Sequence, residues 1–152
     1  MRDGRQSVVE RAQRIHGVAR DRERDAKNEK LAAVRAGVLR ERGAIDLLVA
    51  TGAIGAFGYF SRLPILDILG LVNTTVGRSP DSQATPEFAF PGHQRSNPDY
   101  VFSRKPDYIL IGKRGSKAFG GLVTAPRQLR EHPDLERHYV WDAEVRGYRR
   151  AN

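Results

Sequence analysis

The sequence predicts a small α/β domain: a Rossmann-like layer with a mostly parallel sheet of three to five strands, preceded by an N-terminal helical extension. Three short apolar runs, each bounded by glycine or proline, have the length of buried strands. Roughly a dozen residues separate the first two runs, which is the spacing of a βαβ unit. The residues before these runs show helical periodicity. We therefore expect a charged helical extension at residues 1–42 and an α/β domain at residues 43–152.

Composition excludes several classes of protein. The chain has 152 residues, the size of one domain, and it contains no cysteine, so disulfides and thiolate metal sites are excluded. No apolar stretch approaches the ~20 residues of a membrane-spanning helix, and the N-terminus has no secretory signal. We therefore expect a soluble chain without a transmembrane segment, which would be cytoplasmic if expressed alone.

The extension at residues 5–42 is predicted to be helical because apolar residues recur at helical spacing in both of its halves. Between the halves, Arg20–Lys30 alternates in charge and predicts a solvated face, or a break in the helix with Gly17 as the weak point. Gly43 follows an arginine-rich last turn and is a good C-cap.

The first two strands are predicted at Ala44–Ala50 and Leu63–Leu69. Thr51–Ser61 is small and glycine-rich, and it predicts a tight turn followed by a short helix packed closely on the sheet. Two buried strands joined in this way are expected to be parallel.

The remaining elements follow from proline, glycine and apolar runs. We expect a long polar loop at Gly70–Pro98, a short helix at Asp99–Arg104 and a third buried strand at Asp107–Ile111. A helix broken at Pro133 is expected at Ala125–Arg137, an edge strand at His138–Val145 and a tail at Tyr148–Asn152. Helices should cover both faces of the sheet.

Glycines 52, 55 and 58 follow the first strand, as a dinucleotide-binding loop would. Their uniform spacing of three differs from the GxGxxG pattern, so close helix packing is the preferred explanation.

Asp67 is the most unusual strand residue, since it interrupts a run of buried aliphatic residues at the end of the second strand. This is a place where α/β folds put ligand-contacting groups, although the carboxylate could instead cap the following turn or pair with an arginine. His93, in the long polar loop, could orient a ligand together with Asp67. The four histidines lack metal-ligand spacing, and no carboxylate dyad or nucleophile motif is present, so we expect no metal, no cofactor and no catalytic set.

Two stretches, Val49–Arg78 and Pro91–Ile111, resemble the soluble C-terminal domain of bacterial membrane glycosyltransferases of the C-type fold. These enzymes use polyprenyl-phosphate sugar donors, and the mycobacterial arabinofuranosyltransferases are examples. The elements that carry the resemblance are Tyr59 with Ser61, Asp67-Ile-Leu-Gly-Leu71, Pro91-Gly-His93 and Arg104-Lys-Pro-Asp107. The family's membrane portion with its catalytic aspartate has no counterpart in this chain. Phe60 stands between Tyr59 and Ser61, and Asn73 occupies a place that is more often acidic.

The resemblance implies an accessory or acceptor-facing domain without its own catalytic centre, on the extracytoplasmic face of the membrane. Its implied partners are a glycan acceptor or the membrane portion of the enzyme, and the candidate ligand contacts are Tyr59, Asp67, His93 and Arg95. Two alternatives remain. The net charge of +8 allows a small nucleic-acid-binding protein that uses residues 1–42, although the acidic residues interleaved there weaken that case. A protein-interaction module built on the same helix is the other.

Overall fold

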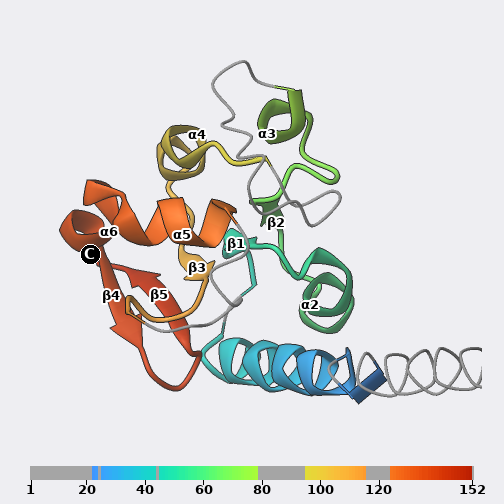
Figure 1. The fold of residues 1–152 in the computed structure, drawn as a ribbon. Helices are drawn as coiled ribbons and strands as arrows, with labels where there is room; N and C mark the ends of the chain where they lie inside the picture. The colour runs from blue at the N-terminus through green and yellow to red at the C-terminus, as the bar shows by residue number, and fades with distance from the viewer. Residues whose placement is uncertain (1–21, 24, 44, 79–94, 116–123, 152) are drawn as a thin grey trace, which may run out of the picture.

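The computed structural model describes residues 22–23, 25–43, 45–78, 95–115 and 124–151. Helices combine with an open five-stranded sheet in the order β2-β1-β3-β5-β4, which confirms the α/β class (Figure 1). After the N-terminal helix the elements are β1 (Val49–Thr51), α2 (Ile54–Ser61), β2 (Ile65–Asp67), α3 (Thr74–Arg78), α4 (Pro98–Ser103), β3 (Tyr108–Leu110), α5 (Thr124–Glu131), α6 (Pro133–His138), β4 (Tyr139–Asp142) and β5 (Gly147–Arg150).

The sheet is only partly parallel. Strand β1 pairs in parallel with both β2 and β3, whereas β5 pairs antiparallel with both β3 and β4. The segment expected to be a tail after Gly147 is strand β5, and it separates β3 from the edge strand β4. Its antiparallel direction follows from the short turn that joins it to β4, because antiparallel neighbours need only a tight connection.

The first two strands are shorter than the apolar runs that predict them. Ile45 lies in a bend with 80% of its surface exposed, so the expectation of a buried strand from Ala44 is wrong at its start. The ladder begins only at Val49, after the backbone N–H of Leu48 has donated to Asp107 Oδ2 at 2.9 Å. Ile68 and Leu69 are buried but lie beyond the end of β2.

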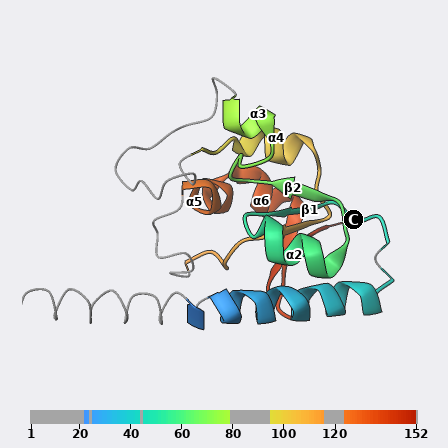
Figure 2. The ribbon, with the colours of Figure 1, turned by 90° about the vertical axis from the view of Figure 1, so that its right-hand side faces the viewer.

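Helices cover both faces of the sheet, as expected. On one face, Val101 and Phe102 of α4, Leu129 of α5 and Leu135 of α6 pack in one core cluster. On the other face, α2 and the N-terminal helix pack through a second cluster. Figure 2 shows the two layers on either side of β1 and β2. Successive strand residues alternate between the clusters: Val49 belongs to the second and Ala50 to the first.

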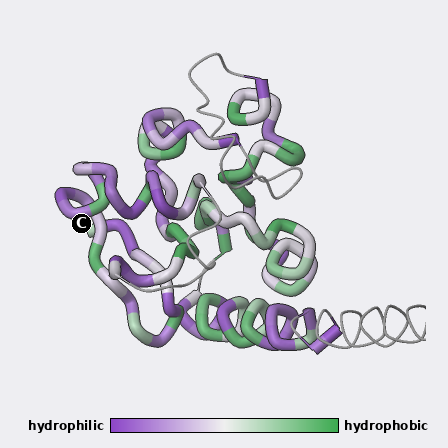
Figure 3. Tube along the Cα trace, viewed as in Figure 1, coloured by the Kyte–Doolittle hydropathy of each residue, from purple (hydrophilic) through white to green (hydrophobic). Residues whose placement is uncertain are grey.

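The N-terminal helix is continuous from residue 25 to residue 41, so the charged stretch up to Lys30 contains no break within the described residues. The expected weak point at Gly17 lies outside them. Its last turns pack on the sheet through Ala32, Ala36 and Leu39, whereas the described residues from 22 to 30 are exposed. Figure 3 shows that projecting part as mainly hydrophilic. Gly43 ends the helix at φ +72°, as predicted. In the described part of the chain, no helix has the length and apolarity needed to cross a membrane.

Candidate functional site

Asp67 ends β2, at the edge where the parallel strands finish, and only 2% of its surface is exposed. Its Oδ1 accepts a hydrogen bond from the backbone N–H of Leu69 at 2.9 Å. Its Oδ2 accepts from the N–H groups of Val72 at 2.7 Å and Asn73 at 3.3 Å. The carboxylate therefore organises the turn after β2, which is the structural role that the sequence left open beside ligand contact.

The turn continues into helix α3 through a close backbone contact. Gly70 has φ +75°, and a Cβ atom there would lie 2.6 Å from the backbone nitrogen of Gly77. The side chain of Asn73 begins the helix, because its Oδ1 accepts from the N–H of Thr75 at 3.1 Å. The resulting turn presents Leu71 and Val72 to solvent, with 48% and 73% of their surfaces exposed.

The predicted site residues do not form one cluster within the described part of the chain. Tyr59 lies in the second half of α2 with 79% of its surface exposed, and its ring meets Phe60 edge-to-face. Because α2 runs from the end of β1 back to the start of β2, Tyr59 lies toward the opposite edge of the sheet from Asp67. Arg95 is exposed, and His93 lies outside the described residues.

The glycine-rich turn after β1 is shaped by side-chain packing. A Cβ at Gly52 would lie 3.0 Å from Leu69 Cδ1, and one at Gly58 would lie 3.1 Å from Ile65 Cδ1. Nothing lies within 4 Å of a Cβ placed at Gly55. Packing therefore explains two of the three glycines, and the Leu69 side chain stands close to the turn that a dinucleotide loop would use.

A pocket of about 510 Å³ lies between α4, α6, the start of β4 and the end of β5. Beside it, His132 Nε2 lies 3.0 Å from Asp99 Oδ1, which resembles an acid–base pair. However, His132 Nδ1 already accepts a hydrogen bond from the N–H of Asp134, which begins α6. Both ring nitrogens are thus engaged, and the ring stacks on Phe102 at 4.5 Å, so this histidine is built into the fold.

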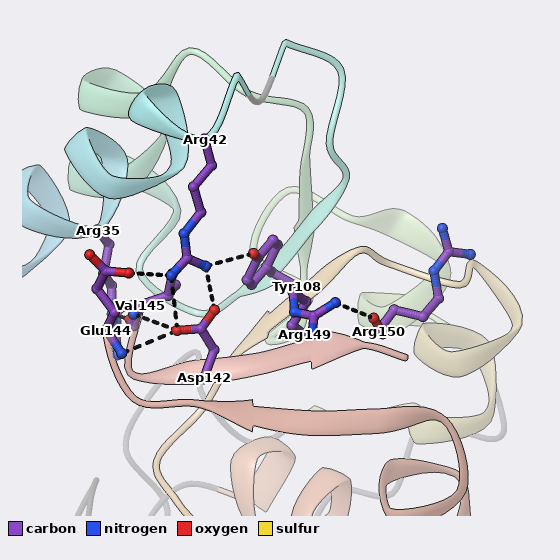
Figure 4. Close-up of polar contacts among 8 residues, drawn as sticks. All are labelled: Arg35, Arg42, Tyr108, Asp142, Glu144, Val145, Arg149 and Arg150. Atoms are coloured by element: carbon purple, nitrogen blue, oxygen red, sulfur yellow. Dashed lines mark hydrogen bonds and ion pairs between the residues drawn. The ribbon is translucent and has the colours of Figure 1, made fainter. Parts of the chain in front are cut away.

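A second polar cluster, which the sequence did not predict, docks the N-terminal helix on the β4–β5 hairpin (Figure 4). The guanidinium of Arg35 donates to the carbonyl oxygens of Val145 at 2.9 Å and Arg146 at 2.7 Å. Arg42 pairs with Asp142 and with Glu144. We call these contacts the hairpin latch. The arginine-rich end of the N-terminal helix was the available signal, but nothing in the sequence indicated the partners of these arginines.

The latch shifts the titration of its members. Burial lowers the pKa of Arg35 to about 10, with the charge of Arg146 acting in the same direction, so Arg35 remains a charged donor at neutral pH. Burial alone would raise the pKa of Asp142, but hydrogen bonds from Arg42 and from the N–H groups of Val145 and Glu144 hold it below its ordinary value. Both charges are therefore retained at neutral pH.

Among the described residues, no three histidine or acidic side chains come together as a metal site would require. Searches of curated proteins and of solved structures found no match. The model of one family, described as a domain of unknown function (DUF8728), matches residues 16–150. The match covers both the described N-terminal helix and the sheet, and the chain therefore belongs to the DUF8728 family.

Proposed function

We propose that this chain is a non-catalytic, acceptor-facing or accessory domain of a polyprenyl-phosphate-sugar-dependent glycosyltransferase, or a stand-alone relative of one. The observation that carries the proposal is the role of Asp67. The acid most suited by position to ligand chemistry accepts three backbone hydrogen bonds and builds a turn. Recognition by the surface of that turn is therefore better supported than catalysis by its carboxylate.

The other elements of the resemblance also have structural roles in neighbouring elements. Asp107, which ends the Arg-x-Pro-Asp element, accepts from Leu48 N–H and pairs with Arg150 at 2.6 Å. Gly70 permits the close contact with Gly77. A set of residues that specifies a scaffold suits a family whose chemistry resides in another segment. The parallel order β2-β1-β3, with α2 and α4 on opposite faces, supports a Rossmann-like interpretation of this half of the sheet.

The glycan-facing surface in this proposal is the edge where β1, β2 and β3 end. Leu71 and Val72 stand exposed there, and the amide side chain of Asn73 lies beside them. Exposed aliphatic groups next to polar ones match the alternating apolar and hydroxyl faces of a sugar ring. On this proposal the domain works on the extracytoplasmic face of a membrane, beside the catalytic portion.

The test is an NMR titration of the full chain with arabinan and mannan oligosaccharides. We expect amide shifts at Leu71, Val72 and Asn73 with at least one of the two. The variant Leu71→Ser/Val72→Ser should weaken binding several-fold, whereas Val34→Ser/Val140→Ser, which also removes exposed valines, should not. Absence of shifts in this turn with both oligosaccharides would contradict the proposal.

A second candidate function is a protein-interaction module. It is favoured by the N-terminal helix, whose described residues from 22 to 30 are exposed while its last turns are docked. The Glu23–Lys27 pair at 2.8 Å, four residues apart, stabilises this projecting part without a partner. Sedimentation of the intact chain tests whether the partner of this helix is a second copy of the chain, an association that the first candidate does not require.

A further inference from the structure

We propose that the edge of the sheet where the parallel strands begin docks on an anionic lipid surface. We call it the basic edge and define it by the exposed cationic residues Arg62, Arg104, Lys105, Arg149 and Arg150. The inference goes beyond the proposed function, because it concerns the edge opposite to the turn that would face a glycan.

The strand registers place these residues on one edge. Val49 is aligned with Ile65 of β2 and with Tyr108 of β3, and Tyr108 is aligned with Arg149 of β5. Arg62 precedes Ile65 by three residues, and Lys105 precedes Tyr108 by three.

Independent observations agree with this placement. Lys105 and Arg150 line the same pocket. Figure 2 shows the C-terminus and the link from the N-terminal helix to β1 at the same end of the molecule. With strands about 4.8 Å apart, the edge from β2 to β5 spans on the order of 15 Å.

Two acidic groups near this edge are paired with arginines: Asp107 with Arg150 at 2.6 Å and Asp134 with Arg137 at 3.6 Å. Asp99 contacts the ring of His132, which carries a charge only when it is protonated. Asp46 is exposed next to Ile45. Within the described part of the chain, Arg62, Arg104 and Lys105 form no ion pair, so an excess of positive charge faces solvent.

Two of these cations occupy backbone conformations that side chains disfavour. Arg62 has φ 56° and Lys105 has φ 49°, both in the left-handed region where glycine is free of strain. Each follows a helix, α2 and α4 respectively, at a position where glycine is the usual residue. Any residue with a side chain is strained in this conformation. A function of the positive charge would explain why Arg62 and Lys105 occupy these two positions in place of glycine.

Two large apolar side chains stand exposed toward the same edge. Ile45, in the link before β1, is 80% exposed, and Tyr59, three residues before Arg62, is 79% exposed. Cations beside exposed aliphatic and aromatic groups characterise surfaces that bind charged headgroups and insert shallowly into a bilayer. A nucleic-acid backbone offers no apolar environment for Ile45, which favours the membrane.

Vesicle flotation with the full chain tests the proposal. We expect binding to phosphatidylcholine vesicles that contain phosphatidylglycerol, and little binding to phosphatidylcholine alone. Binding should weaken strongly when salt rises from about 0.1 M to about 1 M, because the screening length falls from ~10 Å to ~3 Å. Ile45→Ser/Tyr59→Ser should reduce the part of the binding that survives high salt.

The decisive variant is Arg62→Gly/Lys105→Gly, which removes two charges while relieving backbone strain. A cation near an anionic membrane is worth roughly fivefold in partitioning, so this variant should bind roughly 25-fold more weakly. Arg78→Gln/Lys113→Gln removes two exposed cations elsewhere and serves as the matched control, with less than about a twofold change expected.

Several results would overturn the proposal. One is equal binding to vesicles with and without phosphatidylglycerol. Another is an equal loss of vesicle binding in Arg62→Gly/Lys105→Gly and in the control Arg78→Gln/Lys113→Gln. A lower melting temperature of Arg62→Gly/Lys105→Gly with unchanged vesicle binding would assign the cations to helix capping. Salt-sensitive binding to duplex DNA without vesicle binding would assign the edge to nucleic acid. None of these results bears on the oligosaccharide titration, so the two proposals fail separately.

Discussion

The Oδ2 atom of Asp67 accepts a hydrogen bond from the backbone N–H of Val72 at 2.7 Å, and so a buried strand end holds an exposed turn in one conformation. The exposed Val72 side chain thus depends for its position on a carboxylate that solvent barely reaches. This relation fixes the conformation of the turn after β2.

Asp67→Asn should destabilise the domain by about 2 kcal/mol, because hydrogen bonds to a charged acceptor are lost and an amide donor faces backbone donors. Urea unfolding measures this change. Asp46→Asn, which alters an exposed carboxyl group, is the control and should stay near the wild-type value. Equal stability of the two variants would show that the carboxylate does not hold the turn.

Substitutions of three glycines by alanine should give three different results. Gly70→Ala should cost about 3 kcal/mol, because left-handed strain adds to a clash with Gly77. Gly43→Ala shares a positive φ of +72° but meets nothing within 4 Å, so it should cost about 1 kcal/mol. Gly55→Ala lies in helix α2 with open space and should stabilise by about 0.5 kcal/mol. Gly70→Ala should have the lowest thermal midpoint and Gly55→Ala the highest. A different order would contradict the backbone conformations and close contacts given for these glycines.

The hairpin latch predicts coupling between Arg42 and Asp142. A double-mutant cycle of Arg42→Gln and Asp142→Asn should give a coupling energy of about 1 kcal/mol, modest because 35% of the Arg42 side chain is exposed. The same cycle between Arg42 and Asp46 should give none. Hydrogen exchange in the N-terminal helix should rise in parallel with the loss of stability.

The depressed pKa of Asp142 predicts a loss of stability in acid. Because the carboxyl group binds its proton more weakly in the folded state, the unfolded chain takes up more protons as pH falls. The contribution of the latch is complete above the ordinary carboxyl pKa and should be lost below about pH 4. Unfolding of wild type and Asp142→Asn, compared between about pH 6 and about pH 3, should show a smaller acid effect in the variant. If stability fell equally with pH in both proteins, Asp142 would not be the cause of the loss of stability in acid.

The spacing of apolar residues and the positions of glycine and proline predicted most elements of the fold, and the other elements depend on tertiary contacts. Asn97 and Pro98 predict the start of α4, and Pro133 predicts the break between α5 and α6. These elements were predictable because helix caps and prolines act on the backbone within a few residues. Strand β5 escaped prediction because Gly147–Arg150 is short and ends in two arginines, so its place depends on pairing with β3.

The candidate site was likewise predicted from the sequence only in part. Position at a strand end singled out Asp67, and the sequence could not distinguish ligand contact from turn capping because Val72 and Asn73 become its donors only after folding. Ile45 was assigned to a strand on apolarity alone. The hairpin latch joins residues about a hundred positions apart, and no local pattern indicates such a contact.

The position of β5 between β3 and β4 has a consequence for the order of folding during synthesis. While the ribosome has released only the residues up to Asp142, β4 has no neighbour with which to pair, and β3 has one open side. The sheet can close only after residues 147–150 have emerged, and the latch can then hold the first helix against the last hairpin. Until this strand has emerged, the edges of β3 and β4 that later pair with it remain without a partner.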